Sequence, residues 1–468
     1  MIEKFYRSGN DESCVIYGYT PPPDGRYILN DEKYFTGEDY RSVERYKEYK
    51  EAGFNTLLSQ MTALYSGEEW ESSDAKKVMD VAYAAGIDKI ILLDKKIMEL
   101  SRVVGGIVGE GKEFCSEYEL DELIALRMKD YSKHTAFYGV QIVDEPSKDQ
   151  FLSIGQIFHS IKRVCPKAFV QCNLLPLSPF RMTCNRFPQG IDIFDKFEKY
   201  IEAFLDATGA DYFMYDCYPF EETPKYMPLY IRGLQISANI AKKRGCKFYF
   251  VAQSFSMKMN GIMQHIKPTT VDLSWQTNML LAHGVGQFGY YTYWSKIGYL
   301  DNDEYYDYDS GIMTADGKKT TAYYDVKREN EKIQKLFPVL SQFRFNKTTF
   351  AAGSFRSYPC YENYIFSENN LRIKSMITDK EQILLNEFVN EKENLHLYAL
   401  VNATPSNFVY PDGEEQCSTI VFDDDYDCAD VFISDWKTIE IKDKTLSINL
   451  KIGEAAYILP YKKEKKDE

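Results

Sequence analysis

Two apolar segments of the chain end in carboxylates followed by a proline, and these are the residues best suited to chemistry. One segment reads Gly139-Val-Gln-Ile-Val-Asp144-Glu145-Pro146, and the other reads Tyr212-Phe-Met-Tyr-Asp216-Cys-Tyr218-Pro219. Two carboxyl groups facing each other across a pocket are what glycoside cleavage requires, because one protonates the leaving oxygen while the other attacks or activates water. We therefore take Glu145 and Asp216 as the candidate catalytic pair.

Asp144 and Glu145 are neighbours on a predicted strand, where successive side chains alternate. They should therefore point in different directions, with only one aimed directly into a pocket at the strand end. We assign that place to Glu145 and expect Asp144 to bind substrate. A structural alternative is that Asp144 or Ser147 caps the helix that follows. Asp216 has its own alternative, which is to bind a sugar hydroxyl or to orient a neighbouring group.

Other polar and aromatic residues fall at predicted strand ends, where they could bind a sugar. An indole such as that of Trp294 offers a flat face for a sugar ring, and tyrosine combines a ring with a hydroxyl. Each of these residues could equally be a satisfied polar group or a packing residue in the top layer of a core. The candidates for substrate binding are Asp144, Tyr19, Gln60, Asp94, Asn173, Tyr218, Gln253 and Trp294.

The segments that carry these residues alternate with longer amphipathic stretches, a pattern typical of βα units around a parallel sheet. Eight strands without a Gly-rich phosphate-binding turn favour a closed (β/α)₈ barrel, or TIM barrel, over an open doubly wound sheet. The predicted strands are Cys14–Tyr19, Thr56–Met61, Lys89–Asp94, Phe137–Val143, Ala168–Asn173, Tyr212–Asp216, Lys247–Gln253 and Gln287–Trp294. The predicted helices between them are Tyr40–Ala52, Ser73–Ala85, Leu120–Ser132, Lys148–Val164, Phe194–Thr208, Tyr226–Lys243 and Thr270–His283, with Gly53, Gly86, Gly209 and Gly284 as expected helix ends.

The pattern changes after an eighth predicted helix at Thr320–Leu336, where strands and turn residues replace helical segments. We therefore predict an α/β chain with a (β/α)₈ barrel at residues 1–339, a small all-β sandwich at residues 340–462 and a charged tail at residues 463–468. The expected sandwich strands are Leu395–Val401, Thr419–Phe422, Val431–Ser434, Thr438–Ile441 and Ala455–Leu459. Active sites of such barrels form at the carboxyl ends of the strands, where the candidate residues fall.

These segments resemble the clan of (β/α)₈ glycoside hydrolases that includes cellulase-like and β-galactosidase-like enzymes, in which strand four ends in Asn-Glu-Pro or Asp-Glu-Pro. Asp144-Glu145-Pro146 matches that motif, and Asp211–Phe220 is similar to the strand-six segment of the same proteins. Trp275–Trp294 resembles their last helix and strand, and Gly453–Pro460 resembles the closing strand of their sandwich domain. The resemblance implies that Glu145 is the general acid/base, with a pKa raised by an apolar pocket or a neighbouring carboxylate.

The sequence departs from this clan at the end of strand seven. Retaining enzymes of the clan carry a nucleophilic Glu there, whereas this chain has Gln253, whose amide cannot form a glycosyl ester. Three explanations stay open: strand seven is misplaced, another carboxylate such as Asp216 serves, or the reaction is lost or altered. A pair on strands four and six resembles α-galactosidase-type barrels, so the bond cleaved could be α, and inversion with water between the carboxyls is a further alternative.

The composition of the chain indicates which kinds of molecule the protein is expected to bind. The net charge is −14 and there is no basic stripe, which argues against a nucleic-acid partner. No stretch approaches the roughly 18 apolar residues of a membrane helix, so we expect a cytoplasmic protein with no membrane partner, and we leave a homo-oligomer open. The acidic loop Asp301–Asp309 lacks the spacing of a calcium loop and is expected to be a solvated, substrate-covering loop. We expect neither a metal nor an organic cofactor.

Our leading hypothesis is a glycosidase that cleaves a small oligosaccharide or glycoside, with Glu145 as proton donor. The alternative is a catalytically reduced barrel that only binds carbohydrate, a hypothesis that Gln253 keeps open. A barrel enzyme of unrelated chemistry, such as an aldolase, would need a Schiff-base lysine at a strand end. Lys95, which follows strand three, is the residue that comes nearest to that place.

Overall fold

The computed structural model describes residues 1–7, 13–24, 38–59, 63–65, 67–178, 192–221, 227–301, 304–351, 372–378, 382–404 and 415–463. The chain divides into two compact units, which we describe separately. The barrel unit consists of Val15–Pro268 and Gln287–Lys327, and the sandwich unit consists of Met1–Cys14, Thr269–Gly286 and Arg328–Glu468.

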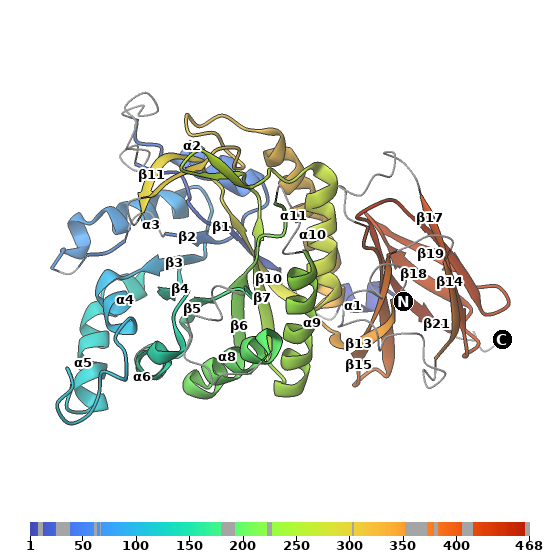
Figure 1. Ribbon diagram of the computed structural model, residues 1–468, viewed down its shortest axis with the longest axis horizontal. Coiled ribbons are helices and arrows are strands. Elements are labelled where there is room, and N and C mark those ends of the chain that lie inside the picture. Colours follow the sequence, from blue (N-terminus) through green and yellow to red (C-terminus); the bar gives the residue numbers. More distant parts are fainter. Residues whose placement is uncertain are drawn as a thin grey trace. The chain divides into compact units, whose positions relative to one another are not determined.

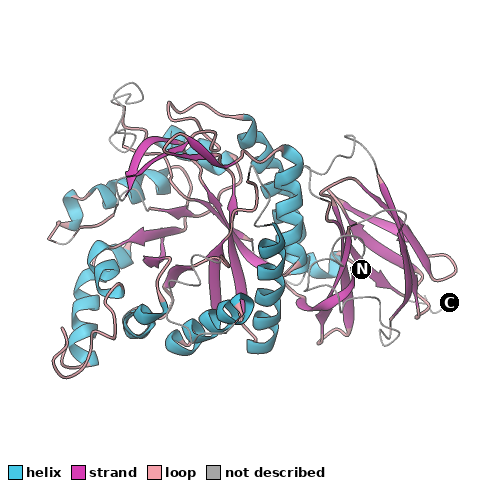
Figure 2. Ribbon diagram, in the orientation of Figure 1, coloured by secondary structure: helices cyan, strands magenta, loops and turns pink. Residues whose placement is uncertain are grey.

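The barrel is built on an eight-stranded parallel sheet in the order β1-β10-β7-β6-β5-β4-β3-β2, which confirms the predicted TIM barrel (Figures 1 and 2). The ring closes between its first and last strands, where the backbone N–H groups of Asn55 and Thr56 both lie 3.1 Å from the Ile16 carbonyl oxygen. The strands are β1 (Val15–Gly18), β2 (Leu57–Leu58), β3 (Ile90–Leu93), β4 (Phe137–Asp144), β5 (Phe169–Leu174), β6 (Tyr212–Asp216), β7 (Lys247–Gln253) and β10 (Val285–Tyr291).

The helices begin and end at residues suited to those positions. Ser73 accepts a hydrogen bond from the N–H of Lys76 at the start of α3, and Gly209 ends α8 in the left-handed conformation that glycine adopts without strain. Gly53, Gly86 and Gly284 also have positive φ angles after helices. The helices are α1 (Glu3–Arg7), α2 (Val43–Glu51), α3 (Asp74–Ala84), α4 (Lys95–Ser101), α5 (Glu117–Met128), α6 (Phe151–Val164), α8 (Ile193–Thr208), α9 (Met227–Arg244), α10 (Thr270–Ala282) and α11 (Thr321–Leu340). Within the described ranges, none of them combines the length and hydropathy needed to cross a membrane.

A second, four-stranded antiparallel sheet belongs to the barrel unit and is absent from the sequence prediction. Its order is β11-β12-β8-β9, so hairpins that follow β7 and β10 pair with each other. Tyr306 of β12 faces Met259 of β8 in this pairing. The strands are β8 (Met257–Met259), β9 (Ile262–His265), β11 (Lys296–Asp301) and β12 (Glu304–Tyr308), and we call them the mouth sheet. The described part of the acidic loop is therefore largely strand rather than a solvated loop.

The sandwich unit contains a six-stranded sheet in the order β13-β15-β16-β21-β18-β19 and a three-stranded sheet in the order β14-β17-β20. Their inner faces share one apolar core that includes Leu400, Ile420 and Ile458, which confirms a sandwich after the barrel. The strands are β13 (Arg344–Ala351), β14 (Ile373–Thr378), β15 (Ile383–Asn390), β16 (Leu395–Asn402), β17 (Gln416–Phe422), β18 (Cys428–Phe432), β19 (Trp436–Glu440), β20 (Thr445–Leu450) and β21 (Ala455–Tyr461).

Helix α10, which the sequence places among the barrel helices, contributes to the compact sandwich unit. The indole N–H of Trp275 donates to the Ala403 carbonyl at 2.9 Å, and the side-chain amide of Asn278 donates to the Gly453 carbonyl at 2.7 Å. Both side chains are fully buried. These bonds anchor Trp275 and Asn278 in the core of the sandwich unit.

Candidate active site

The carboxyl ends of the barrel strands enclose a cavity of about 700 Å³. That volume lies within the range of ligand pockets, and the position is the one where barrel enzymes build their sites. Among the residues that the structure describes, the charged ones on its wall are the carboxylates Asp144, Glu145, Asp216 and Glu221 and the cations Lys95, Arg102 and Lys296. Its aromatic residues are Tyr19, Tyr218, Phe255, His265, Tyr291, Tyr306 and Tyr308.

Glu145 reaches the cavity through an unusual backbone conformation. It is the first residue after β4 and has a φ of +48°, the left-handed region that residues other than glycine seldom adopt. Its N–H donates to the Asn173 carbonyl at 2.8 Å, which ties the turn to β5. The change in φ breaks the alternation of the strand, so Asp144 and Glu145 both line the cavity, contrary to the expectation that only one would. Strained backbone of this kind is concentrated at functional sites.

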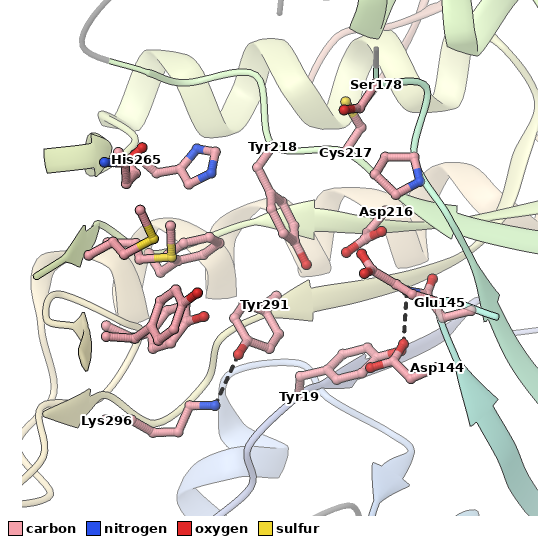
Figure 3. A pocket seen from close by; sticks show the side chains of 18 of the residues that line it. Tyr19, Asp144, Glu145, Ser178, Asp216, Cys217, Tyr218, His265, Tyr291 and Lys296 are labelled. Atoms are coloured by element: carbon pink, nitrogen blue, oxygen red, sulfur yellow. Dashed lines mark hydrogen bonds between the residues drawn. The ribbon is translucent and has the colours of Figure 1, made fainter. Parts of the chain in front are cut away.

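Asp144 lies beside the neighbouring strand. Its Oδ1 accepts a hydrogen bond of 3.1 Å from the Asn173 side-chain amide (Figure 3). Tyr19 lines the same part of the cavity, and its hydroxyl accepts a hydrogen bond of 3.0 Å from Gln171. The structure thus brings together the sequence-predicted residues Asp144, Asn173 and Tyr19.

Asp216, at the end of β6, is buried at 6% exposure beside the other carboxylates. Its Oδ1 has no hydrogen-bond partner among the described residues, although it borders the cavity. The pKa of Asp216 is raised to about 6, first by burial and then by the negative charge of Asp144, while hydrogen bonds from Tyr218 and Asn173 act in the opposite direction. Figure 3 shows Asp216 and Glu145 side by side, with the Tyr218 hydroxyl pointing toward them.

Gln253 ends β7 at the predicted residue, but its side chain is fully buried and is not among the residues that line the cavity. Its Oε1 accepts the N–H of Phe220 at 3.0 Å, and its Nε2 donates to the carbonyls of Phe220, Phe255 and Ile266 at 3.2, 3.2 and 3.0 Å. The amide therefore ties together the segments that follow β6, β7 and β9. Because the predicted end of strand seven is correct, misplacement of that strand does not explain the amide at its end.

Trp294 does not lie on the cavity wall, in contrast to the expectation of a sugar platform. Its side chain is 1% exposed, its indole N–H donates to the Ala315 carbonyl at 3.2 Å, and its ring packs 4.7 Å from that of Tyr40. The indole is a core residue because the chain turns it away from the cavity after β10.

Asp94 also has a structural role. Its Oδ1 caps α4 by accepting the N–H of Lys96 at 3.0 Å and that of Ile97 at 3.3 Å, and the Arg127 guanidinium donates to both of its carboxylate oxygens at 3.0 Å. A carboxylate with this many donors is a satisfied buried group. Gln60 lies outside the described residues.

Several cavity residues were not predicted, and about half of them belong to the mouth sheet or its flanks. Lys296 donates to the Tyr291 hydroxyl at 2.9 Å and lies 4.8 Å from the centre of the Tyr308 ring (Figure 3). Burial lowers the pKa of His265 to about 4, so its ring is neutral. The tyrosine-rich run at residues 305–308 was the signal in the sequence that could have identified this wall. Within the described ranges, no three His, Cys, Asp or Glu side chains are grouped so that they could hold a metal ion.

The fold resembles that of known carbohydrate-active proteins. An α-amylase from Anoxybacillus superposes with a TM-score of 0.51 at 12% identity, over 97% of this chain and 99% of that one. A catalytic mutant of a GH42 β-galactosidase from G. stearothermophilus superposes with a TM-score of 0.55 at 9% identity, over 96% of this chain and 98% of that one. Identities this low establish a shared fold and no more. The sequence matched no protein-family model, and a search of curated proteins found no match.

Proposed function

We propose that the protein is a glycoside hydrolase that cleaves a small oligosaccharide or glycoside with Glu145 and Asp216 as its two carboxyl groups. The observation that carries the proposal is that both side chains line one cavity of about 700 Å³, from the carboxyl ends of β4 and β6. The full-length fold similarity to an α-amylase and a β-galactosidase supports the same class of reaction. Fold alone fixes chemistry poorly, so the pair of carboxyl groups is the stronger argument.

In the proposed reaction, the Glu145 carboxyl donates its proton to the glycosidic oxygen as the bond from that oxygen to the anomeric carbon breaks. Asp216, in its ionised form, either attacks the anomeric carbon or removes a proton from the water that attacks it. In the first case water later hydrolyses the ester and Glu145 regains its proton, which gives retention; in the second case the product is inverted. Three other wall residues, Tyr19, Asp144 and Asn173, would bind sugar hydroxyls.

The experiment that tests this function is proton NMR of the wild-type protein mixed with a panel of α- and β-linked oligosaccharides and glycosides. We expect the anomeric signal of at least one substrate to be replaced by that of a released sugar. The anomer that forms first reports retention or inversion. A panel in which no substrate is consumed, while bound sugars show broadened lines, would contradict hydrolysis.

That second outcome would favour the alternative function, a barrel that binds carbohydrate without cleaving it. The observation in its favour is Gln253, because the strand-seven position that supplies a nucleophile in the clan that this sequence resembles is occupied by an amide bonded to backbone groups. Turnover separates the two functions, since both predict binding.

The assignment of roles makes a prediction about pH. If Asp216 must be ionised, kcat/KM of the wild type should fall as the pH drops below about 6, the pKa of that carboxyl. Asp144→Asn removes a negative charge that raises this pKa, so the acid limb should move to lower pH. The replacement keeps an oxygen that can accept the hydrogen bond from Asn173. The measurement is a pH profile of kcat/KM for both proteins.

A different profile would reverse the assignment. If activity falls above about pH 6, and Asp144→Asn moves that alkaline limb to lower pH, Asp216 is the proton donor and Glu145 the ionised partner. If Asp144→Asn shifts neither the acid nor the alkaline limb of the pH profile, neither limb reports the ionisation of Asp216.

A further inference from the structure

One wall of the cavity carries two cations, Lys95 and Arg102, that have no role in the proposed reaction. Lys95 is the first residue of α4 and is half-buried, and Arg102 follows the last residue of the same helix and is exposed. Neither side chain forms an ion pair or a hydrogen bond with a residue that the structure describes. The two side chains line the same cavity and lie close enough to interact. The pKa of Lys95 is lowered first by burial and then by the positive charge of Arg102, while the negative charge of Glu99 opposes both effects.

The third cation on the wall is differently placed. Lys296 donates to the Tyr291 hydroxyl and lies over the rings of Tyr291 and Tyr308 at 5.2 and 4.8 Å. That lysine is held by the protein itself. The Lys95 and Arg102 side chains, by contrast, carry like charges that repel each other, and a bound anion would relieve that repulsion.

The basic pair lies on the Glu145 side of the cavity. Strand β3, which precedes Lys95, is paired with β4, which precedes Glu145. The carbonyl of Arg102 accepts a hydrogen bond of 2.8 Å from Gln150, in the segment that follows Glu145. A group that contacts the pair is therefore attached to the part of the substrate next to the proton donor, which is the leaving group.

We propose that Lys95 and Arg102 form a subsite for an oxyanion on the leaving-group portion of the substrate, so that the substrate class is an anionic glycoside. A guanidinium binds carboxylate, sulfate or phosphate through paired N–H donors, and an ammonium adds a compact charge. Among the described residues, the other charges that face the cavity are Lys296, which the protein itself holds, and the carboxylates Asp144, Glu145, Asp216 and Glu221, which disfavour an anion beside them. The inference rests on the proposed function in taking the ligand to be a glycoside and Glu145 to be the proton donor.

The test is ligand-observed NMR titration of the full chain with matched sugars that differ in one group. The pairs are glucose with glucuronate and galactose with galacturonate, followed by glucose 6-phosphate and glucose 6-sulfate, which distinguish the three oxyanions. Inorganic phosphate and sulfate alone measure the contribution of charge without sugar. We expect at least one charged sugar to bind wild type about tenfold more tightly than its neutral partner, with the preference reduced at high salt.

Variants of the two cations test whether Lys95 and Arg102 cause the preference for a charged sugar. Lys95→Met combined with Arg102→Met should abolish the preference for the charged sugar while leaving the binding of the neutral sugar unchanged. Arg102→Met alone changes an exposed side chain, should not impair folding, and should remove part of the preference. The matched control is Lys129→Met, an exposed lysine at the end of α5 that should change nothing.

Equal affinity for charged and neutral sugars, undetectable binding of every charged probe, or a preference that survives the double variant would each overturn the inference. These results are separable from failure of the proposed function, because the titration measures binding. If the protein prefers a charged sugar but cleaves no glycoside, the result supports the anion subsite and contradicts the hydrolase function. If it cleaves neutral glycosides and shows no preference for a charged sugar, the result supports the hydrolase function and contradicts the anion subsite.

Discussion

Glu145→Gln is expected to lower kcat/KM by about 10²–10⁴-fold on glycosides whose leaving group must be protonated, and much less on glycosides of acidic phenols. The amide keeps the shape of the side chain and cannot donate a proton to the glycosidic oxygen. A phenol of low pKa departs as its anion, so it does not need that proton. The measurement is the ratio of kcat/KM for wild type and variant on two aryl glycosides that differ in leaving-group pKa.

Two further variants make the result specific to Glu145. Asp216→Asn should lose activity on both classes of leaving group, because the attacking or base-catalysed step is needed for each. Glu221→Gln is the matched control, since this carboxylate lines the same cavity and has no assigned role, so its activity should stay within a few-fold of wild type. An equal loss on good and poor leaving groups for Glu145→Gln would remove it from the role of proton donor.

The barrel strands could be predicted because each is an apolar run bounded by turn residues. The predicted strands Tyr212–Asp216 and Lys247–Gln253 coincide with β6 and β7. The mouth sheet could not be predicted, because β8 and β9 have three and four residues with side chains that are only partly buried or exposed, too short for a clear alternation. These strands form because β8 pairs with β12, nearly fifty residues later, and no local pattern encodes such pairing.

The candidate site was harder to predict than the fold, because a strand end does not determine where its side chain points. A single φ of +48° brings Glu145 into the cavity beside Asp144. Trp294 occupies an equally promising place in the sequence, yet its indole turns into the core against Tyr40. The sequence identified Asp216 as a carboxylate at a strand end, but the rise in its pKa depends on burial and on Asp144, which comes from another strand.

Gln253 is the residue at which sequence comparison and structure lead to opposite expectations. The clan that the sequence resembles would make Gln253→Glu a restoration of the strand-seven nucleophile. The structure predicts the reverse, because the side chain donates to the carbonyls of Phe220, Phe255 and Ile266, and an ionised carboxylate has no hydrogen to donate to them. A carboxylate in that position would be buried and would lack the two N–H groups of the amide, although the N–H of Phe220 could still donate to it. We expect the variant to lose activity and about 3–5 kcal/mol of unfolding free energy near pH 8.

The pH dependence of that loss separates charge from shape. Burial against carbonyls would raise the pKa of the introduced carboxyl above its unfolded value of about 4.3, so the unfolded state releases its proton first as the pH rises. The stability deficit relative to wild type should therefore be smaller near pH 5 and larger near pH 8, as measured by denaturant unfolding followed by circular dichroism. Gln253→Met is the control, since it also loses the hydrogen bonds but carries no ionisable group, and its deficit should not change with pH. A Gln253→Glu protein as stable as wild type and more active would mean that this position accepts a nucleophile, and that the backbone contacts of the amide do not govern it.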